Sequence, residues 1–199
     1  MRFSIIIPAY NAEKHIRKCL DSIKQQTFTD YELIVVCDSC DDNTEQIAKE
    51  YGAITKVVNF HQDGQTRNTG IEMAKGEWVL FLDDDDWWLH EFVLEQLDNK
   101  LSWCPGIDIL CFSFIFGKWK YASPKGNQGG RWIAVWNKCW RREFIGDTRF
   151  SDKHSISDVD FHYQMFHKNP VVVDWDMPMY YYDYMREGSI TETDRAGKK

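Results

Sequence analysis

The first hundred residues alternate continuous apolar runs with amphipathic stretches, and this alternation constrains the fold more than any other feature of the chain. Apolar runs typical of buried strands lie at 3–7, 31–36, 54–60 and 77–82. Between and after them, the 3.6-residue spacing predicts helices at 12–26, 41–52, 65–75 and 89–101. Strands that are apolar throughout are buried on both faces, as in a parallel sheet with helices on both sides. The sequence therefore predicts an α/β fold.

The second half is less regular and predicts a smaller, mixed part of the sheet. Strands are expected at 107–116, 132–136, 171–173 and 179–184, with a polar loop at 118–131 and a helix at 157–167. A polar tail at 191–199 is expected to be mobile. Because no repeat or linker divides the 199 residues, we expect one domain over 1–199, with halves at about 1–100 and about 101–190.

Four consecutive carboxylates, Asp83 to Asp86, directly follow the apolar run 77–82. Their charges repel one another, and hard divalent cations prefer carboxylate oxygens. In an extended chain, Asp83 and Asp85 would point to one face while Asp84 and Asp86 point to the other, leaving one side for a metal and one for a hydroxyl-bearing ligand. A solvated acidic loop is the alternative reading. The two tryptophans that follow argue against it, because large aromatic side chains usually pack on something.

Polar residues follow the ends of three expected strands. Tyr10, Asp38 and the cluster 83–86 each come directly after an apolar run. In parallel α/β sheets, ligands bind at the carboxyl ends of the strands. We therefore expect these residues to gather at one edge of the sheet.

Charge and cysteine content limit the class of partner. The formal net charge is −7 and no Lys/Arg cluster stands out, whereas a nucleic-acid binder shows a basic face. No segment approaches the roughly 18 apolar residues of a membrane span, and Met1 opens straight into a strand, so we expect a cytoplasmic protein without a leader. The six cysteines lack a secreted spacing and are expected to be reduced; redox or zinc roles for the pair Cys37 and Cys40 are minor alternatives.

Six segments, taken in order, resemble family 2 glycosyltransferases with the GT-A fold. They are the opening strand at 4–11, an aspartate loop at 32–44, an Arg-Asn helix at 64–76, a D-x-D motif at 81–86, the position of a Glu-Asp pair at 157–161 and an aromatic strand at 180–191. The resemblance implies a GT-A-like, mostly parallel sheet with a nucleotide-binding first half and a smaller, mixed acceptor half. It also implies inverting, metal-dependent transfer of a sugar from a nucleotide-diphosphate sugar to a hydroxyl, in polysaccharide or glycoconjugate biosynthesis.

The resemblance also implies roles for individual residues of the donor site. Asp85, supported by Asp83, would hold Mn²⁺ or Mg²⁺ against the diphosphate, and Asp84 would meet a ribose or donor-sugar hydroxyl. The remaining donor-binding residues would be Pro8, Ala9, Tyr10, Asn11, Asp38 and Arg67. On local grounds Asp38 is equally a cap of the next helix, and Arg67 a salt-bridged helix residue.

Asp158 is the general base that the resemblance implies, with Asp160 as the fallback. Both also fit helix capping boxes, at 155–158 and 157–160, and carboxylates are favoured in a first helical turn anyway. The family's Glu is replaced by Ser157. Two tryptophans, Trp136 and Trp140, are candidates for the acceptor side, with burial in the core as the alternative.

The expected partners follow from the same resemblance. They are a UDP-sugar as donor and a glycan or glycolipid hydroxyl as acceptor, met near the inner face of a membrane; a homo-oligomer is left open. A nucleotidyltransferase would want a Gly-rich, basic phosphate loop, which residues 8–11 lack. A non-catalytic nucleotide-sugar or glycan-binding protein with the same fold is the alternative that Ser157 allows.

Overall fold

The computed structural model describes residues 1–118, 120–126, 130–153 and 156–184. The strands are β1 Phe3–Ala9, β2 Tyr31–Asp38, β3 Ile54–Val58, β4 Trp78–Phe81, β5 Trp87–Trp88, β6 Ile109–Phe116, β7 Lys120–Ala122, β8 Lys138–Arg141 and β9 Val172–Tyr182. The helices are α1 Ile16–Lys24, α2 Thr44–Glu50, α3 Asp63–Met73, α4 Val93–Trp103, α5 Arg142–Ile145 and α6 Ser157–His167. The predicted mobile tail at 191–199 lies outside the described residues.

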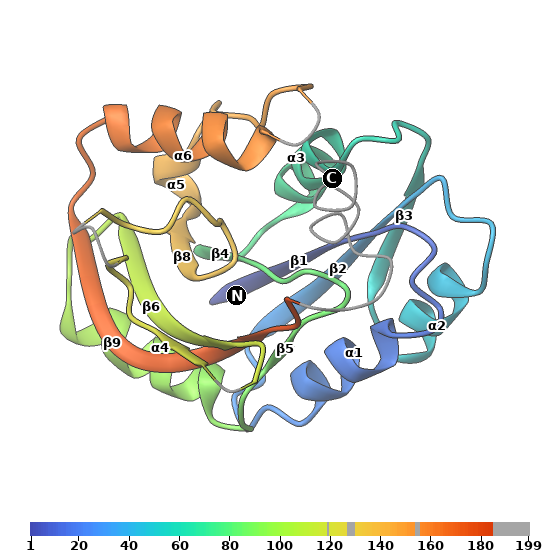
Figure 1. The fold of residues 1–199 in the computed structure, drawn as a ribbon, viewed down its shortest axis with the longest axis horizontal. Coiled ribbons are helices and arrows are strands. Elements are labelled where there is room, and N and C mark those ends of the chain that lie inside the picture. Colours follow the sequence, from blue (N-terminus) through green and yellow to red (C-terminus); the bar gives the residue numbers. More distant parts are fainter. Residues whose placement is uncertain (119, 127–129, 154–155, 185–199) are drawn as a thin grey trace.

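One mixed sheet runs through the whole molecule in the order β3-β2-β1-β4-β8-β6-β9-β5, and β7 pairs with β6. The four strands of the first half pair in parallel, as predicted. Strands β1, β2 and β4 are buried as expected, but β3 is largely exposed because it lies at the edge of the sheet. Helices α3 and α6 lie on one side of the sheet and α1, α2 and α4 on the other (Figure 1). The predicted GT-A-like α/β architecture is confirmed.

Helix α3 packs closely on β1, and Gly70 makes this approach feasible. A Cβ at Gly70 would lie 2.3 Å from Ile6 Cγ2, so no larger residue fits without displacing the helix. This contact fixes the height of α3 over the sheet. It places Arg67, one turn earlier on the helix, at the carboxyl ends of the strands.

The strand predicted at 132–136 is wrong, and the strand of this region follows it as β8. The reason is the buried Lys138, whose Nζ donates to the carbonyl oxygens of Trp132 at 2.6 Å and Ala134 at 2.5 Å. These carbonyls point to an ammonium group instead of a neighbouring strand. Alternating hydrophobicity alone does not reveal such a competitor for the backbone.

The short strands predicted at 171–173 and 179–184 are two ends of one strand, β9. The segment between them is acidic and contains Pro178, so its sequence is typical of a loop. In the structure β9 stays paired with β6 through register shifts on either side of Ser113. A bulge of this kind accommodates residues that a regular ladder excludes.

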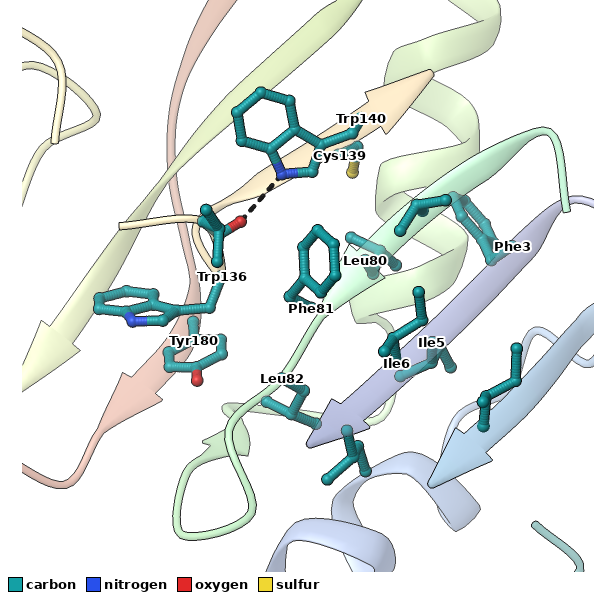
Figure 2. Packing of buried hydrophobic residues seen from close by; sticks show 14 of the residues in the cluster. Phe3, Ile5, Ile6, Leu80, Phe81, Leu82, Trp136, Cys139, Trp140 and Tyr180 are labelled. Carbon is teal, nitrogen blue, oxygen red and sulfur yellow. Dashed lines mark hydrogen bonds between the residues drawn. The ribbon is translucent and has the colours of Figure 1, made fainter. Parts of the chain in front are cut away.

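Aromatic side chains fill the core between the two halves (Figure 2). Trp140 is fully buried and donates its Nε1–H to Val135 O at 3.0 Å. Trp136 stacks on Tyr180 with ring centroids 4.5 Å apart. Both tryptophans therefore belong to the core. The suggestion that they line an acceptor site is wrong, because both rings are buried against other side chains.

The first helix is shorter than predicted and begins at Ile16 instead of residue 12. Asn11 does not cap it. Instead Asn11 has a positive φ of 46°, and its Oδ1 accepts the backbone N–H of Asp41 at 2.9 Å. Asn11 thus joins the loops that follow β1 and β2. Among the described residues, no helix has the length and apolar character needed to cross a bilayer.

Candidate active site

The carboxyl ends of β1, β2 and β4 meet at one edge of the sheet, as predicted. The backbone N–H of Tyr10 donates to Asp84 Oδ2 at 3.3 Å, which joins the end of β1 to the acidic cluster after β4. Tyr10 itself is 60% exposed, and Pro8 and Ala9 precede it at the end of β1. The structure thus brings most of the predicted donor-site residues into one neighbourhood.

Residues 83–86 form a turn, since the N–H of Asp86 donates to Asp83 O at 3.1 Å. The expected division into two faces is therefore wrong, because it required an extended chain. Each carboxylate of the turn instead has surroundings of its own. The assignment of Asp83 and Asp85 to a metal and of Asp84 to the donor stays a prediction.

Asp84 is held by two donors from the first half of the chain. His15 Nε2 lies 3.1 Å from Asp84 Oδ1, and the Tyr10 N–H contacts the other carboxylate oxygen. Burial raises the pKa of Asp84 above its ordinary value. His15 carries no motif in the sequence, so its role was missed.

Asp86 serves the fold. It is fully buried and accepts the Tyr180 hydroxyl at 2.5 Å and the Asp183 N–H at 2.7 Å. Tyr180 in turn accepts the Asp83 N–H at 3.2 Å. Strand β9 of the second half is thereby tied to the acidic turn of the first half.

Arg67 lies among three carboxylates and is only 6% exposed. Its Nη1 donates to Asp63 Oδ2 at 2.6 Å, its Nη2 donates to Asp83 Oδ1 at 2.8 Å, and Nη1 lies 3.6 Å from Asp158 Oδ1. Burial alone would lower the pKa of Arg67, but the three carboxylates raise it above its ordinary value, so it stays a cation. Arg67 therefore links the acidic turn to α6. Its predicted contact with a nucleotide remains a prediction.

Asp158 lies in the first turn of α6, and burial raises its pKa above the ordinary value of a carboxyl group. Its Oδ1 is shielded from solvent and has no hydrogen-bond partner among the described residues. The capping-box reading at 157–160 is not what the structure shows, because no side chain of the described residues caps this helix and Ser157 Oγ donates to Asp63 Oδ2 at 3.1 Å. Residue 155, which the other capping box needs, lies outside the described residues. A half-buried carboxylate with a raised pKa suits a proton acceptor.

Asp38 is saturated with donors inside the protein. It accepts the backbone N–H groups of Phe60, His61 and Gln62 and the hydroxyl of Thr66. Burial alone would raise the pKa of Asp38, but these hydrogen bonds hold it below its ordinary value. Asp38 thus fixes the loop that enters α3, and not the helix that follows it in the chain, as the capping alternative had it. Its contact with a nucleotide base stays a prediction.

The oxygen ligands at the acidic turn suit a hard divalent cation. Burial, opposed by Arg67 and reinforced by the charge of Asp85, raises the pKa of Asp83 to about 7, and a bound cation would offset this crowding of negative charge. Across the described part of the chain, no group of three metal-binding side chains is present. A magnesium ion that binds together with a substrate needs only one or two protein carboxylates, because phosphate oxygens of the substrate are also ligands. Asp83 and Asp85 fit that type of site.

Sequence reasoning missed Asp63, which contacts both Arg67 and Ser157. The predicted helix began at residue 65, whereas α3 begins at Asp63, and this earlier start places Asp63 and Arg67, four residues apart, on one face of the helix. Asn68, the other member of the Arg-Asn motif, is a structural tie. Its side chain bonds both the N–H and the carbonyl oxygen of Phe150, just before α6.

A model of glycosyl transferase family 2 matches residues 4–172. The chain belongs to this family. Glycosyltransferase GlyA of Streptococcus pneumoniae is 36% identical over 105 residues, covering 50% of this chain and 15% of GlyA. Poly(ribitol-phosphate) beta-N-acetylglucosaminyltransferase TarS of Staphylococcus aureus is 39% identical over 95 residues, covering 44% of this chain and 17% of TarS. The chain thus spans a small part of the length of these curated family 2 relatives.

Solved structures show the same fold. The crystal structure of S. aureus TarS 1–349 in complex with UDP-GlcNAc aligns with a TM-score of 0.81 at 26% identity, covering 97% of this chain and 61% of that one. Mannosyltransferase PcManGT of Pyrobaculum calidifontis, in complex with GDP-Man and Mn²⁺, aligns with a TM-score of 0.73 over 94% of this chain and 58% of that one. At 17% identity, the second likeness is one of fold.

Proposed function

We propose that this family 2 chain transfers a sugar, with inversion, from a UDP-sugar to a hydroxyl group of a glycan or glycolipid. The observation that carries the proposal is the half-buried carboxylate of Asp158, which lies 3.6 Å from Arg67, a residue that also donates to Asp83 of the acidic turn at 2.8 Å. The Arg67 side chain thus connects the proposed proton acceptor, Asp158, to the proposed site of the diphosphate leaving group at Asp83. TarS, solved with UDP-GlcNAc, supports UDP as the nucleotide.

In the proposed reaction the Asp158 carboxylate takes the proton of the acceptor hydroxyl. The acceptor oxygen then bonds to the anomeric carbon from the face opposite the diphosphate, and the bond from that carbon to the diphosphate oxygen breaks. One carboxylate suffices, since a neutralised diphosphate leaves without a proton, unlike the two-carboxylate chemistry of glycoside hydrolysis. Asp83 and Asp85 would hold Mn²⁺ or Mg²⁺, which when bound supplies Lewis acidity toward the diphosphate.

The donor would lie over the end of β1, against Pro8, Ala9 and Tyr10, with Asp84 at a hydroxyl of the ribose or sugar. The names of the relatives support polymer or glycoconjugate synthesis, since TarS is named for a poly(ribitol-phosphate) acceptor. A membrane-held acceptor would place the reaction at the inner face of the membrane.

The test begins with thermal melting in the presence of UDP, UDP-GlcNAc and UDP-glucose, with and without Mn²⁺. A ligand that binds the native state raises the melting temperature, so a metal-dependent rise identifies the donor. The donor that gives the largest rise is then used to measure UDP release, with water as acceptor.

Asp158→Asn keeps the shape of the side chain but removes its charge. We expect it to lower UDP release by about 10²- to 10⁴-fold while the thermal shift persists. Asp160→Asn is measured beside it, because Asp160, one half-turn further along α6 and 3.6 Å from Lys153, is the fallback base and should matter only if Asp158 does not. Unchanged release in the Asp158 variant would remove Asp158 from the mechanism. Binding without any release by the wild type would favour a non-catalytic, nucleotide-sugar-binding protein.

A further inference from the structure

We infer that Asp63 is a positioning residue for the general base, because its carboxylate holds the Arg67 guanidinium away from Asp158. The inference rests on the proposed function, in which Asp158 receives the proton of the acceptor. Asp63 was not among the residues that the sequence motifs mark. The structure alone brings it to the site, from α3 on the same side of the sheet as α6 (Figure 1).

The Asp63 carboxylate contacts one side chain of α3 and one of α6. Its Oδ2 accepts Arg67 Nη1 at 2.6 Å and Ser157 Oγ at 3.1 Å, and Ser157 directly precedes Asp158. Burial alone would raise the pKa of Asp63, but Arg67, Ser157 and the Gly64 N–H hold it below its ordinary value. Asp63 is therefore an anion at neutral pH.

Asp63 and Asp158 compete for one nitrogen of Arg67. The distance from Nη1 to Asp63 Oδ2 is 2.6 Å, whereas the distance from Nη1 to Asp158 Oδ1 is 3.6 Å, too long for a hydrogen bond. The same Asp158 Oδ1 has no other hydrogen-bond partner among the described residues. Asp63 thus keeps Asp158 free of a hydrogen bond from Arg67, which would weaken this carboxylate as a base.

The close approach of α3 and α6 is built into the sequence at Gly64. A Cβ at this position would lie 2.9 Å from Ser157 Cβ and 2.6 Å from the carbonyl oxygen of Ser151. Any side chain at residue 64 would separate the two helix starts and break the contact between Asp63 and Ser157. Gly64 is therefore required for this arrangement.

Ser157 occupies the position at which the resembled family carries a Glu carboxylate before its Asp. In this fold the carboxylate beside Ser157 comes from α3 instead, because Asp63 touches the Ser157 hydroxyl. The charge next to the base is thus retained, although the residue that carries it belongs to another helix.

Removal of the Asp63 charge has a defined consequence. Arg67 Nη1, released from its shorter partner, can close on Asp158 Oδ1 and form a full ion pair there. A carboxylate that is hydrogen-bonded to a guanidinium is a weaker base. The charge of Lys138 also acts on Asp158 and lowers its pKa. When Asp63 is neutral, both Arg67 and Lys138 therefore weaken Asp158 as a base.

The experiment compares UDP release and donor thermal shift for the 199-residue wild type, Asp63→Asn, Asp158→Asn and the control Glu72→Gln. Glu72 is exposed on α3 and far along the helix from Asp63. We expect Asp63→Asn to lower kcat by about tenfold or more, with the donor KM and thermal shift close to those of the wild type. Glu72→Gln should change neither quantity.

A double variant distinguishes a charge requirement from a structural one. Asp63→Ser combined with Ser157→Asp exchanges the two side chains, so total volume, the hydroxyl–carboxylate pair and one negative charge are all kept. We expect this variant to recover most of the kcat that Asp63→Asn loses. A purely structural role of Asp63 predicts no recovery, since neither residue is then in its native place.

Each outcome decides between the inference and the function on which it rests. Wild-type kcat in Asp63→Asn, with Asp158→Asn inactive, would overturn the inference and leave the proposed function standing. A low kcat that the exchange does not recover, together with a lost thermal shift, would also overturn the inference, because Asp63 would then only maintain the fold. Full activity of Asp158→Asn, or no UDP release by the wild type, would overturn the proposed function and the inference together.

Discussion

Two buried cations, one in each half of the molecule, have opposite surroundings. Arg67 in α3 faces three carboxylates, and their charges raise its pKa although it is buried. Lys138 in β8 is fully buried and donates to two backbone carbonyls and to Asn137 Oδ1 at 2.7 Å. Burial lowers the pKa of Lys138 to about 8.

The comparison teaches that the partners of a buried cation distinguish its roles. The three carboxylates around Arg67 carry more negative charge than the guanidinium carries positive charge. This region therefore retains a net negative charge that a metal or a proton can offset. Neutral oxygens around Lys138 accept its hydrogen bonds, and Asp158 and Asp174 act on its charge without contacting it, which suits a residue that ties a loop into place. We therefore expect Arg67 to affect catalysis and stability together, and Lys138 to affect stability alone.

The largest effect is expected for Arg67→Met. Removal of the cation leaves Asp63, Asp83 and Asp158 to repel one another, and breaking a buried ion pair typically costs about 3–5 kcal/mol. Urea unfolding measures this loss, and UDP release should fall as well. Arg17→Met is the control, because Arg17 is half-exposed and pairs with Glu50 on the surface. A variant with wild-type stability would show that the three carboxylates do not need a cation.

A smaller effect, about 1–3 kcal/mol, is expected for Lys138→Met. The variant leaves the carbonyl oxygens of Trp132 and Ala134 without the Lys138 donor, while it also removes the desolvation cost of the ammonium group. Unfolding should become easier, and the donor-induced thermal shift should stay unchanged. The exposed Lys56→Met serves as control. Loss of donor binding in Lys138→Met would contradict the separation of roles.

The link between the halves is tested by Tyr180→Phe. Asp86 is fully buried, and loss of the Tyr180 hydroxyl leaves it with the Asp183 N–H as its remaining donor among the described contacts. We expect a loss of about 1–2 kcal/mol in the free energy of unfolding. Tyr163→Phe, at an exposed position of α6, should cost much less. Equal losses would mean that the hydroxyl does not join the halves.

The smallest effect concerns pH. Burial, with help from Lys138 and Arg131, lowers the pKa of His162 to about 4 from its ordinary 6.5. Because the unfolded chain binds this proton more tightly, stability that His162 contributes above pH 6.5 is lost as the pH falls toward 4. Allowing for solvent screening, the wild type should lose on the order of 1 kcal/mol relative to His162→Gln over that range. Parallel stability curves would show that His162 does not titrate this way.

Local patterns predicted the elements of the first half well. Its strands, its helices and the convergence of Tyr10 with the acidic cluster followed from apolar runs, because β1, β2 and β4 are buried; β3 formed as well, although it lies exposed at the edge of the sheet. The second half was predicted less well. Strand β8 and the continuity of β9 depended on Lys138 and on a bulge opposite Ser113, and neither feature has a local pattern.

By itself, the sequence determined the α/β class, the family and the approximate place of the site, since hydrophobic periodicity and motif order are properties of the chain alone. The tertiary structure decided which carboxylates do what. It buried Asp86 as a tie to Tyr180, saturated Asp38, and set Asp63 between Arg67 and Ser157. The physical reason is that the role of a carboxylate depends on the donors and charges within a few ångströms, and residues far apart in the chain supply them.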